Sequence, residues 1–239
     1  MSESSSAARA SEIQRQTETI FEEKPLRYVI QNLEATFDEP QLKQKSAPLD
    51  MLVKIILSQA TTDVLSAQTF AALKKRFKTW EKVLAADESE IAETIKLGGL
   101  ANQKSKVIKD LLSQIKEQHG SLDLNFLQDL PNGEAAEYLQ QFRGIGPKTV
   151  ACTLLFACHK DIFPLDTHIF RVLRRVGIVP NKCSDARAHE ILDKIVPAGK
   201  FYSLHVNLIR LGRKICRPKE PLCERCPIVE YCDYGISRI

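Results

Sequence analysis

Apolar residues recur every three or four positions along most of the chain, the spacing that places them on one face of an α-helix. Residues 49–60, LDMLVKIILSQA, have such a face: Leu49, Leu52, Val53, Ile56 and Leu57. Residues 104–119, KSKVIKDLLSQIKEQH, have another. The same spacing occurs in five further segments: 133–142, 147–158, 166–177, 184–196 and 200–216. Sustained strand alternation is absent, so the sequence predicts an all-α protein.

Glycine and proline separate these segments, which is typical of helix ends. They occur at Gly98-Gly99, Pro131, Gly144, Gly146, Gly177 and Pro197. Asp166 or Thr167 is expected to cap one helix and Ser184 another, because short polar side chains accept hydrogen bonds from the first turn.

Residues 138–158, YLQQFRGIGPKTVACTLLFAC, have the pattern of a helical hairpin. An apolar helix is expected to end at Phe142, and a second to start at Pro147. Gly144 and Gly146 permit backbone conformations that other residues avoid, and Pro147 suits a first helical turn. The free N–H groups of that turn would favour a phosphate. A plain turn between two helices is the alternative.

Lys148 follows the hairpin turn, and Asp166 follows the apolar pair Pro164-Leu165. A lysine that loses its proton beside a carboxylate can attack an electrophilic carbon and form a Schiff base. Both residues also have a structural interpretation, since most lysines are solvated and an aspartate before a helix is usually a cap. The two residues alone leave these interpretations open.

Four of the seven cysteines lie in CRPKEPLCERCPIVEYC, residues 216–232. The start of the chain has no apolar core typical of a secretory signal, so a reducing compartment is expected, where clustered cysteines indicate metal binding. Thiolates suit tetrahedral zinc or an iron–sulfur cluster. The spacing of six, two and five intervening residues favours the larger cluster, because structural zinc sites usually have two short pairs.

The 239 residues carry a net charge of +4, and residues 200–239 account for all of that excess. A basic tail suggests an anionic partner, although a solvated surface is the simpler alternative. No apolar run approaches the roughly 20 residues needed to cross a membrane. Residues 1–19 are polar with scattered acidic groups, and we expect a disordered leader there.

Together, FRGIGPKTVACTLLFA, PLDTHIFRVLRR and the four-cysteine spacing resemble the endonuclease III family of helix-hairpin-helix DNA glycosylases, over roughly residues 25–235. The resemblance implies two helical domains with a DNA-binding cleft between them. One is a six-helix barrel, residues 43–159, that contains the helix-hairpin-helix at 138–158. The other combines residues 20–42 and 160–239. The resemblance implies a [4Fe-4S] cluster on Cys216, Cys223, Cys226 and Cys232.

The resemblance also implies the chemistry. Lys148 is then the nucleophile and Asp166 its partner. The target nucleotide is flipped out of the duplex, Lys148 displaces the damaged base at C1′, and Asp166 helps to deprotonate the amine and offsets charge on the sugar. The resulting imine promotes β-elimination, which breaks the strand.

Gln59 and Leu100 are the implied plugs that fill the space left by the flipped nucleotide. Without the resemblance, Leu100 could be a core residue and Gln59 a surface amide of a helix. Family members usually have Leu-Ser-Ala-Gln-Ala-Thr-Asp, whereas this chain has Leu-Ser-Gln-Ala-Thr-Thr-Asp at 57–63. If helical, that shift rotates the glutamine by about 100°. Asp63 is expected either in the lesion pocket or as a helix cap.

The other expected DNA contacts lie around the hairpin, on the helix after Asp166 and in the tail. They are Arg143, Gly144, Gly146, Thr149, His168, Arg171, Arg217 and Lys219. Contacts from Arg217 and Lys219 would be made to phosphates, which set affinity but carry no sequence information.

These features predict a bifunctional DNA glycosylase and AP lyase that removes oxidised pyrimidines from double-stranded DNA. The alternatives are a glycosylase for G·T or G·U mismatches and a non-catalytic, redox-sensing DNA-binding protein. A monomer is expected, without membrane attachment. It would be cytoplasmic, associated with the nucleoid in a bacterium or archaeon, and nuclear in a eukaryote.

Overall fold

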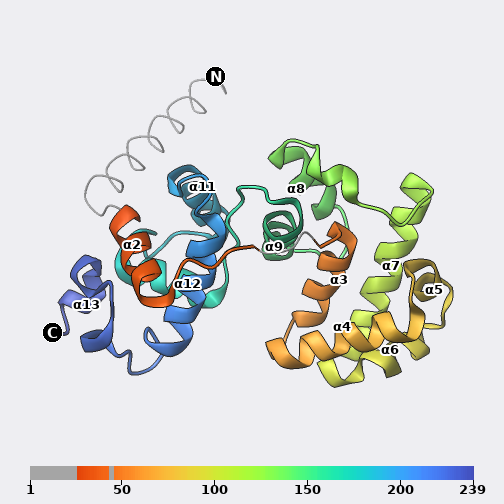
Figure 1. Ribbon diagram of the computed structural model, residues 1–239, viewed down its shortest axis with the longest axis horizontal. Coiled ribbons are helices and arrows are strands. Elements are labelled where there is room, and N and C mark those ends of the chain that lie inside the picture. The colour runs from red at the N-terminus through yellow and green to blue at the C-terminus, as the bar shows by residue number, and fades with distance from the viewer. Residues whose placement is uncertain (1–25, 43–45) are drawn as a thin grey trace. The chain divides into compact units, whose positions relative to one another are not determined.

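The computed structural model describes residues 26–42 and 46–239, and these contain α-helices and 3₁₀ helices but no strand. They form two compact units, which are residues 46–162 and residues 26–42 together with 163–239. The boundary follows Ile162, three residues after the predicted one. All of the predicted leader, residues 1–19, lies outside the described part, which begins at residue 26 (Figure 1).

The helices of residues 46–162 enclose one apolar core. They are α3 Pro48–Ser58, α4 Asp63–Phe77, α5 Trp80–Ala85, α6 Glu88–Ile95, η1 Lys96–Gly98, α7 Ala101–His119, η2 Asn125–Gln128, α8 Asn132–Gln140 and α9 Pro147–Cys158. The face predicted for α3 is buried at all five positions. Helix α9 packs on α3 and α8 (Figure 1).

The predicted helix 49–60 is too long at its end. Helix α3 ends at Ser58, and Gln59 has extended geometry with φ −64° and ψ 131°. Ala60 then takes a left-handed backbone with φ 52°. Since Gln59 is not helical, the one-residue shift of the glutamine does not amount to a helical rotation.

Residues 26–42 and 163–239 form the other unit. Its helices are α2 Leu26–Phe37, α10 Thr167–Val176, α11 Asp185–Ile195, α12 Phe201–Lys214, η3 Cys223–Arg225, η4 Val229–Tyr231 and α13 Asp233–Ile236. Helix α12 packs against α10 and α2. Ser184 caps α11 by accepting from the Arg187 backbone N–H, as predicted.

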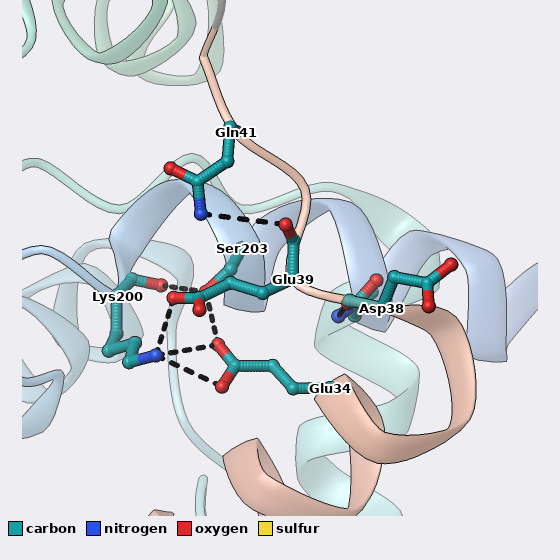
Figure 2. A network of polar contacts seen from close by, with 7 residues as sticks. Glu34, Asp38, Glu39, Gln41, Lys200 and Ser203 are labelled. Atoms are coloured by element: carbon teal, nitrogen blue, oxygen red, sulfur yellow. Dashed lines mark hydrogen bonds and ion pairs between the residues drawn. The ribbon is translucent and has the colours of Figure 1, made fainter.

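Polar contacts join α2 and its following loop to α12 (Figure 2). The Lys200 ammonium donates to both oxygens of Glu34, at 3.0 and 3.1 Å, and to Glu39 at 2.5 Å. The Ser203 hydroxyl donates to Glu34 at 2.7 Å. These contacts tie residues 26–42 to the start of α12 within one unit.

Candidate active site and metal centre

The hairpin, residues 138–158, depends on the tight turn between α8 and α9. Phe142 and Ile145 anchor the turn in the core, with 2% and 6% of their surface exposed. Gly144 has φ 85°, and a Cβ there would lie 3.2 Å from the Val107 side chain. A side chain at position 144 is therefore disfavoured by conformation and by space. Helix α8 ends at Gln140, two residues before the predicted end.

Gly146 does not need the conformational freedom of glycine. Its φ of −89° and ψ of 171° are accessible to any residue, so that part of the prediction is wrong. Gly146 is the N-cap of α9, it provides no side-chain cap, and Pro147 begins the helix. The first-turn N–H groups are thus left without a side-chain acceptor from the N-cap, at the positive end of the helix dipole.

Lys148 is the second residue of α9, and its side chain is exposed. Thr149 follows it but is buried, with 5% exposed. Of the two, only Lys148 can present a side chain at this end of the helix. Thr149 is left with its backbone N–H as the group that it can offer to a phosphate. Arg143, in the turn, is exposed.

Asp166 is the N-cap of α10, the first of the two residues, Asp166 and Thr167, that the sequence offered for this cap. Its Oδ1 accepts from the Ile169 N–H at 2.7 Å, and the residue is half-buried. The residues before it are fixed, because His205 Nδ1 lies 3.0 Å from the Pro164 carbonyl oxygen and Asp193 accepts from the Phe163 N–H at 2.8 Å. The capping bond uses one carboxylate oxygen, so capping and chemistry at the other oxygen are compatible.

Arg171 is directed into the protein. Its guanidinium donates to the Cys216 carbonyl at 3.0 Å and to the Gly212 carbonyl at 2.8 Å, and it lies 3.2 Å from His168 Nδ1. The sequence nominated Arg171 and His168 as DNA contacts. In the structure, both are half-buried, and Arg171 holds the start of the cysteine segment, residues 216–232, against α10 and α12.

The two predicted plug residues are exposed in loops of residues 46–162. Leu100 is 54% exposed and precedes α7, so it is not a core residue. Gln59 is exposed just after α3. Thr62, and not Asp63, caps α4 by accepting from the Leu65 N–H, and Asp63 lies in the first turn. The capping interpretation of Asp63 is therefore wrong.

The four tail cysteines line one small cavity, together with Ile215, Pro221, Leu222, Val229, Tyr234 and Gly235. Burial above all, together with the neighbouring thiols Cys232, Cys216 and Cys223, raises the pKa of Cys226 to about 11, against the lowering effect of the Ile228 backbone N–H. Burial also raises the pKa of Cys232. Across residues 26–42 and 46–239, no three His, Cys, Asp or Glu side chains are grouped to hold a single metal ion.

Hydrogen-bond donors approach two of these sulfurs. Arg175 donates to Cys216 Sγ at 3.3 Å, and the Gly235 N–H donates to Cys232 Sγ at 3.3 Å. Arg175 also donates to the carbonyls of Arg217 and Pro218, at 2.7 and 3.0 Å. Donors of this kind favour a thiolate. No local pattern indicates a role for Arg175, because its partners lie more than forty residues further along the chain.

Arg217 and Lys219 are exposed in the same segment. The backbone carbonyl of Arg217 is held by Arg175, while Lys219 lies two residues further on. Both cationic side chains can therefore reach an external anion from a segment whose backbone is tied to α10.

Comparison with known proteins identifies the family to which this chain belongs. Residues 53–198 match the HhH-GPD superfamily base excision DNA repair protein family, and they include the hairpin, Lys148 and Asp166. The chain belongs to this family. It is an enzyme of the endonuclease III-like group, and the predicted family is confirmed.

Individual relatives agree. The chain is 36% identical over 200 residues to the putative DNA glycosylase At3g47830 of Arabidopsis thaliana, covering 80% of this chain and 68% of that protein. It is 32% identical to an endonuclease III of Sulfolobus acidocaldarius, covering 79% and 82% of the two chains. The DNA glycosylase/AP lyase ROS1 of Arabidopsis is 31% identical, but this HhH-GPD protein covers only 14% of it.

Solved structures confirm the fold. A trapped endonuclease III–DNA covalent intermediate superposes with a TM-score of 0.75 and 24% identity, covering 89% of this chain and 96% of that one. The predicted all-α class is confirmed for the HhH-GPD protein by its helices and by this neighbour. In the part of the chain that the structure describes, no helix is long and apolar enough to cross a membrane.

Proposed function

We propose that this protein is a bifunctional DNA N-glycosylase and AP lyase that acts on damaged pyrimidines, chiefly oxidised ones, in double-stranded DNA. The observation that carries the proposal is the exposed amine of Lys148 at the N-terminal end of α9, directly after the glycine turn. A DNA phosphate bound by the first-turn N–H groups would bring a sugar close to that amine.

In the proposed reaction, the target nucleotide leaves the base stack, because its sugar carbon cannot be attacked within it. The neutral Lys148 amine forms a bond to C1′, and the bond from C1′ to the base breaks, so that the base leaves with the electron pair and takes up a proton. Opening of the sugar ring gives an imine between C1′ and Lys148. Loss of a C2′ proton then expels the 3′ phosphate and cleaves the strand.

Asp166 has two proposed tasks in this scheme. Its carboxylate accepts the proton that the Lys148 ammonium must lose, and its negative charge stabilises the positive charge that develops on the sugar. The capping bond to Ile169 N–H at 2.7 Å fixes the carboxylate in one orientation. Preorganised charge of this kind needs no rearrangement during the reaction.

Gln59 and Leu100 are the proposed plugs for the space that the flipped nucleotide leaves. Their exposure in two loops of the same unit supports this role. An apolar side chain that enters between base steps unstacks them. Asp63 is proposed for the lesion pocket, in the first turn of α4.

Phosphate contacts would come from Arg143 and the hairpin N–H groups in one unit, and from Arg217 and Lys219 in the other. Each of these contacts contributes to affinity in a salt-dependent way and carries no base specificity.

The donor set of the cysteine segment fits a [4Fe-4S] cluster on Cys216, Cys223, Cys226 and Cys232. Four thiols line one apolar cavity, and the donors Arg175 and Gly235 N–H approach two of the sulfurs. When bound, the cluster supplies metal–thiolate bonds that fold a segment with little core of its own. The excision chemistry needs no electron, so the proposed role of the cluster is structural.

Borohydride trapping tests this function. Reduction of the imine should link the wild-type protein covalently to abasic duplex DNA, and Lys148→Gln should give no linked product. Lys75→Gln, which removes an exposed lysine on α4, is the matched control and should trap like wild type. A wild type without adduct, or a Lys148→Gln protein that traps equally well, would overturn the lyase mechanism.

Substrate choice is tested by excision from a panel of duplexes. We expect release of thymine glycol and other oxidised pyrimidines. Release of thymine from G·T pairs, without any release of thymine glycol, would instead make the protein a mismatch glycosylase.

A further inference from the structure

Lys104 is an unusual charged residue in this protein. Of the lysine, arginine, aspartate and glutamate residues that the structure describes, it alone is buried, with 2% of its surface exposed. Burial lowers its pKa. A buried ammonium is costly unless hydrogen bonds replace its hydration, so its partners indicate what it holds in place.

The Lys104 ammonium joins the ends of two helical segments, α3 and η1, that are far apart in sequence and that directly precede the loops of Gln59 and Leu100. Nζ donates to the Leu57 carbonyl at 2.9 Å and to the Gly98 carbonyl at 2.8 Å. Leu57 lies in the last turn of α3, where carbonyls have no partner within the helix. The backbone N–H of Lys104 also donates to the Leu100 carbonyl, at 2.9 Å. One residue thus fixes the chain two positions before Gln59, two positions before Leu100, and at Leu100 itself.

Both loops carry a strained backbone next to these contacts. Ala60 has φ 52° and Leu100 has φ 51°, the left-handed region that side chains other than glycine disfavour. Such conformations persist where surrounding contacts impose them, and they cluster at functional sites. Neither Gln59 nor Leu100 is held by burial of its own side chain, since both are exposed.

There is little free space around Gly98, whose carbonyl accepts from the Lys104 ammonium. A Cβ at Gly98 would lie 3.0 Å from the Thr69 hydroxyl oxygen on α4. The loop before α7 is therefore packed against α4 as well as bonded to the Lys104 ammonium.

We propose that Lys104 is a positioning residue that holds the loops of Gln59 and Leu100 in a fixed relative arrangement, so that the two side chains enter the DNA duplex together. The inference rests on the proposed function. If both loops are already ordered, the protein avoids the entropic cost of ordering them each time a nucleotide is flipped. Lys104 itself has no contact with DNA in this scheme.

The test compares Lys104→Met with Lys160→Met. Methionine keeps much of the side-chain volume but donates no hydrogen bond. Lys160 is the matched control, because its ammonium likewise joins two carbonyls of the same unit, those of Gln128 and Leu130, away from both loops. Each full-length variant is assayed below the unfolding midpoint that circular dichroism gives for it.

Three readouts are used. Lys104→Met should slow excision from a lesion duplex by about tenfold or more relative to Lys160→Met. Tenfold corresponds to about 1.4 kcal/mol, a part of what two hydrogen bonds from a charged donor contribute. Lys104→Met should also reduce the increase in fluorescence of 2-aminopurine placed opposite a tetrahydrofuran abasic analogue. This increase reports entry of Gln59 and Leu100 into the duplex. Cleavage of an abasic site in single-stranded DNA, where there is no opposing strand to enter, should be unchanged.

A double-mutant cycle separates positioning from general destabilisation. Adding Leu100→Ala to Lys104→Met should cost little further excision, because residues that act through one another are not additive. Equal duplex excision by the two methionine variants, or full additivity, would overturn the inference. If Lys104→Met does not fold, Lys104→Gln, which retains an amide donor, takes its place in the same comparison. Absence of trapping by wild type would instead count against the proposed function.

Discussion

Helix α9 and the cysteine segment are stabilised in different ways. Nine of the twelve residues of α9 are buried, so the hairpin that presents Lys148 belongs to a continuous apolar core. Between residues 216 and 232, only Ile228 and Cys232 are buried hydrophobic positions. Hydrogen bonds from Arg171 and Arg175 hold that segment, and we propose that metal–thiolate bonds complete it. Helix α9, which carries the Lys148 amine, and the cysteine segment should therefore respond to different perturbations.

The largest effect is expected from loss of a cluster ligand. Metal binding to a small structural site releases on the order of 10 kcal/mol, which is folding free energy for the residues involved. Cys226→Ser should therefore abolish the visible absorbance of the cluster and expose residues 216–232 to protease, while α9 stays protected from hydrogen exchange.

Cys152→Ala is the control, because Cys152 is a buried cysteine of α9 and does not line the thiol cavity. It should keep the visible absorbance. A Cys226→Ser protein that stays coloured, or a wild type loaded with zinc, would contradict the proposed cluster.

A smaller effect is expected from a cavity in the hairpin core. Leu154 is fully buried in α9, and Leu154→Ala should lower the free energy of unfolding by about 2–5 kcal/mol. Chemical denaturation measures this loss. Leu97→Ala, at a leucine that is 62% exposed, should change it by less than about 0.5 kcal/mol. Equal losses in the two variants would show that α9 is not held by burial.

The smallest effect concerns the contacts of α2 with α12. Hydrogen bonds from Lys200 to Glu39 and Glu34 raise the pKa of Lys200. Because the folded-state pKa is raised, this stabilisation is complete below the ordinary pKa of about 10.4 and is lost as pH rises through the raised value.

The loss should be at most about 1 kcal/mol, since the pairs are partly exposed. Denaturant unfolding of wild type, at pH values below the ordinary pKa of lysine and above the raised pKa of Lys200, should show this loss of unfolding free energy. The loss should be smaller in Lys200→Met. An identical alkaline loss in both proteins would remove Lys200 as its source.

The fold could be predicted from sequence because the helical period is written in residues that are close together. The faces of α3 and α7, the caps Asp166 and Ser184, and the need for glycine at position 144 all follow from local rules. The end of α3 could not be predicted, because LSQATTD has no glycine or proline to mark it.

Lys104 and Arg175 could not be predicted for a different reason. Their partners are carbonyls and a thiol that tertiary packing brings near, up to 47 residues away for Lys104 and 41 to 43 residues away for Arg175. In the sequence, Arg175 is a cationic residue on the polar side of a helix, while Lys104 stands one turn before Ile108 on the apolar face of α7. Their roles follow only from where the neighbouring backbone ends up.

The proposed mechanism requires that the amine of Lys148 forms the covalent bond to DNA. Peptide mass mapping of the borohydride-trapped adduct tests it most directly, because it identifies the modified residue. We expect a sugar remnant on the peptide that contains Lys148. A remnant on any other amine, such as another lysine side chain or the N-terminal amine, would contradict it.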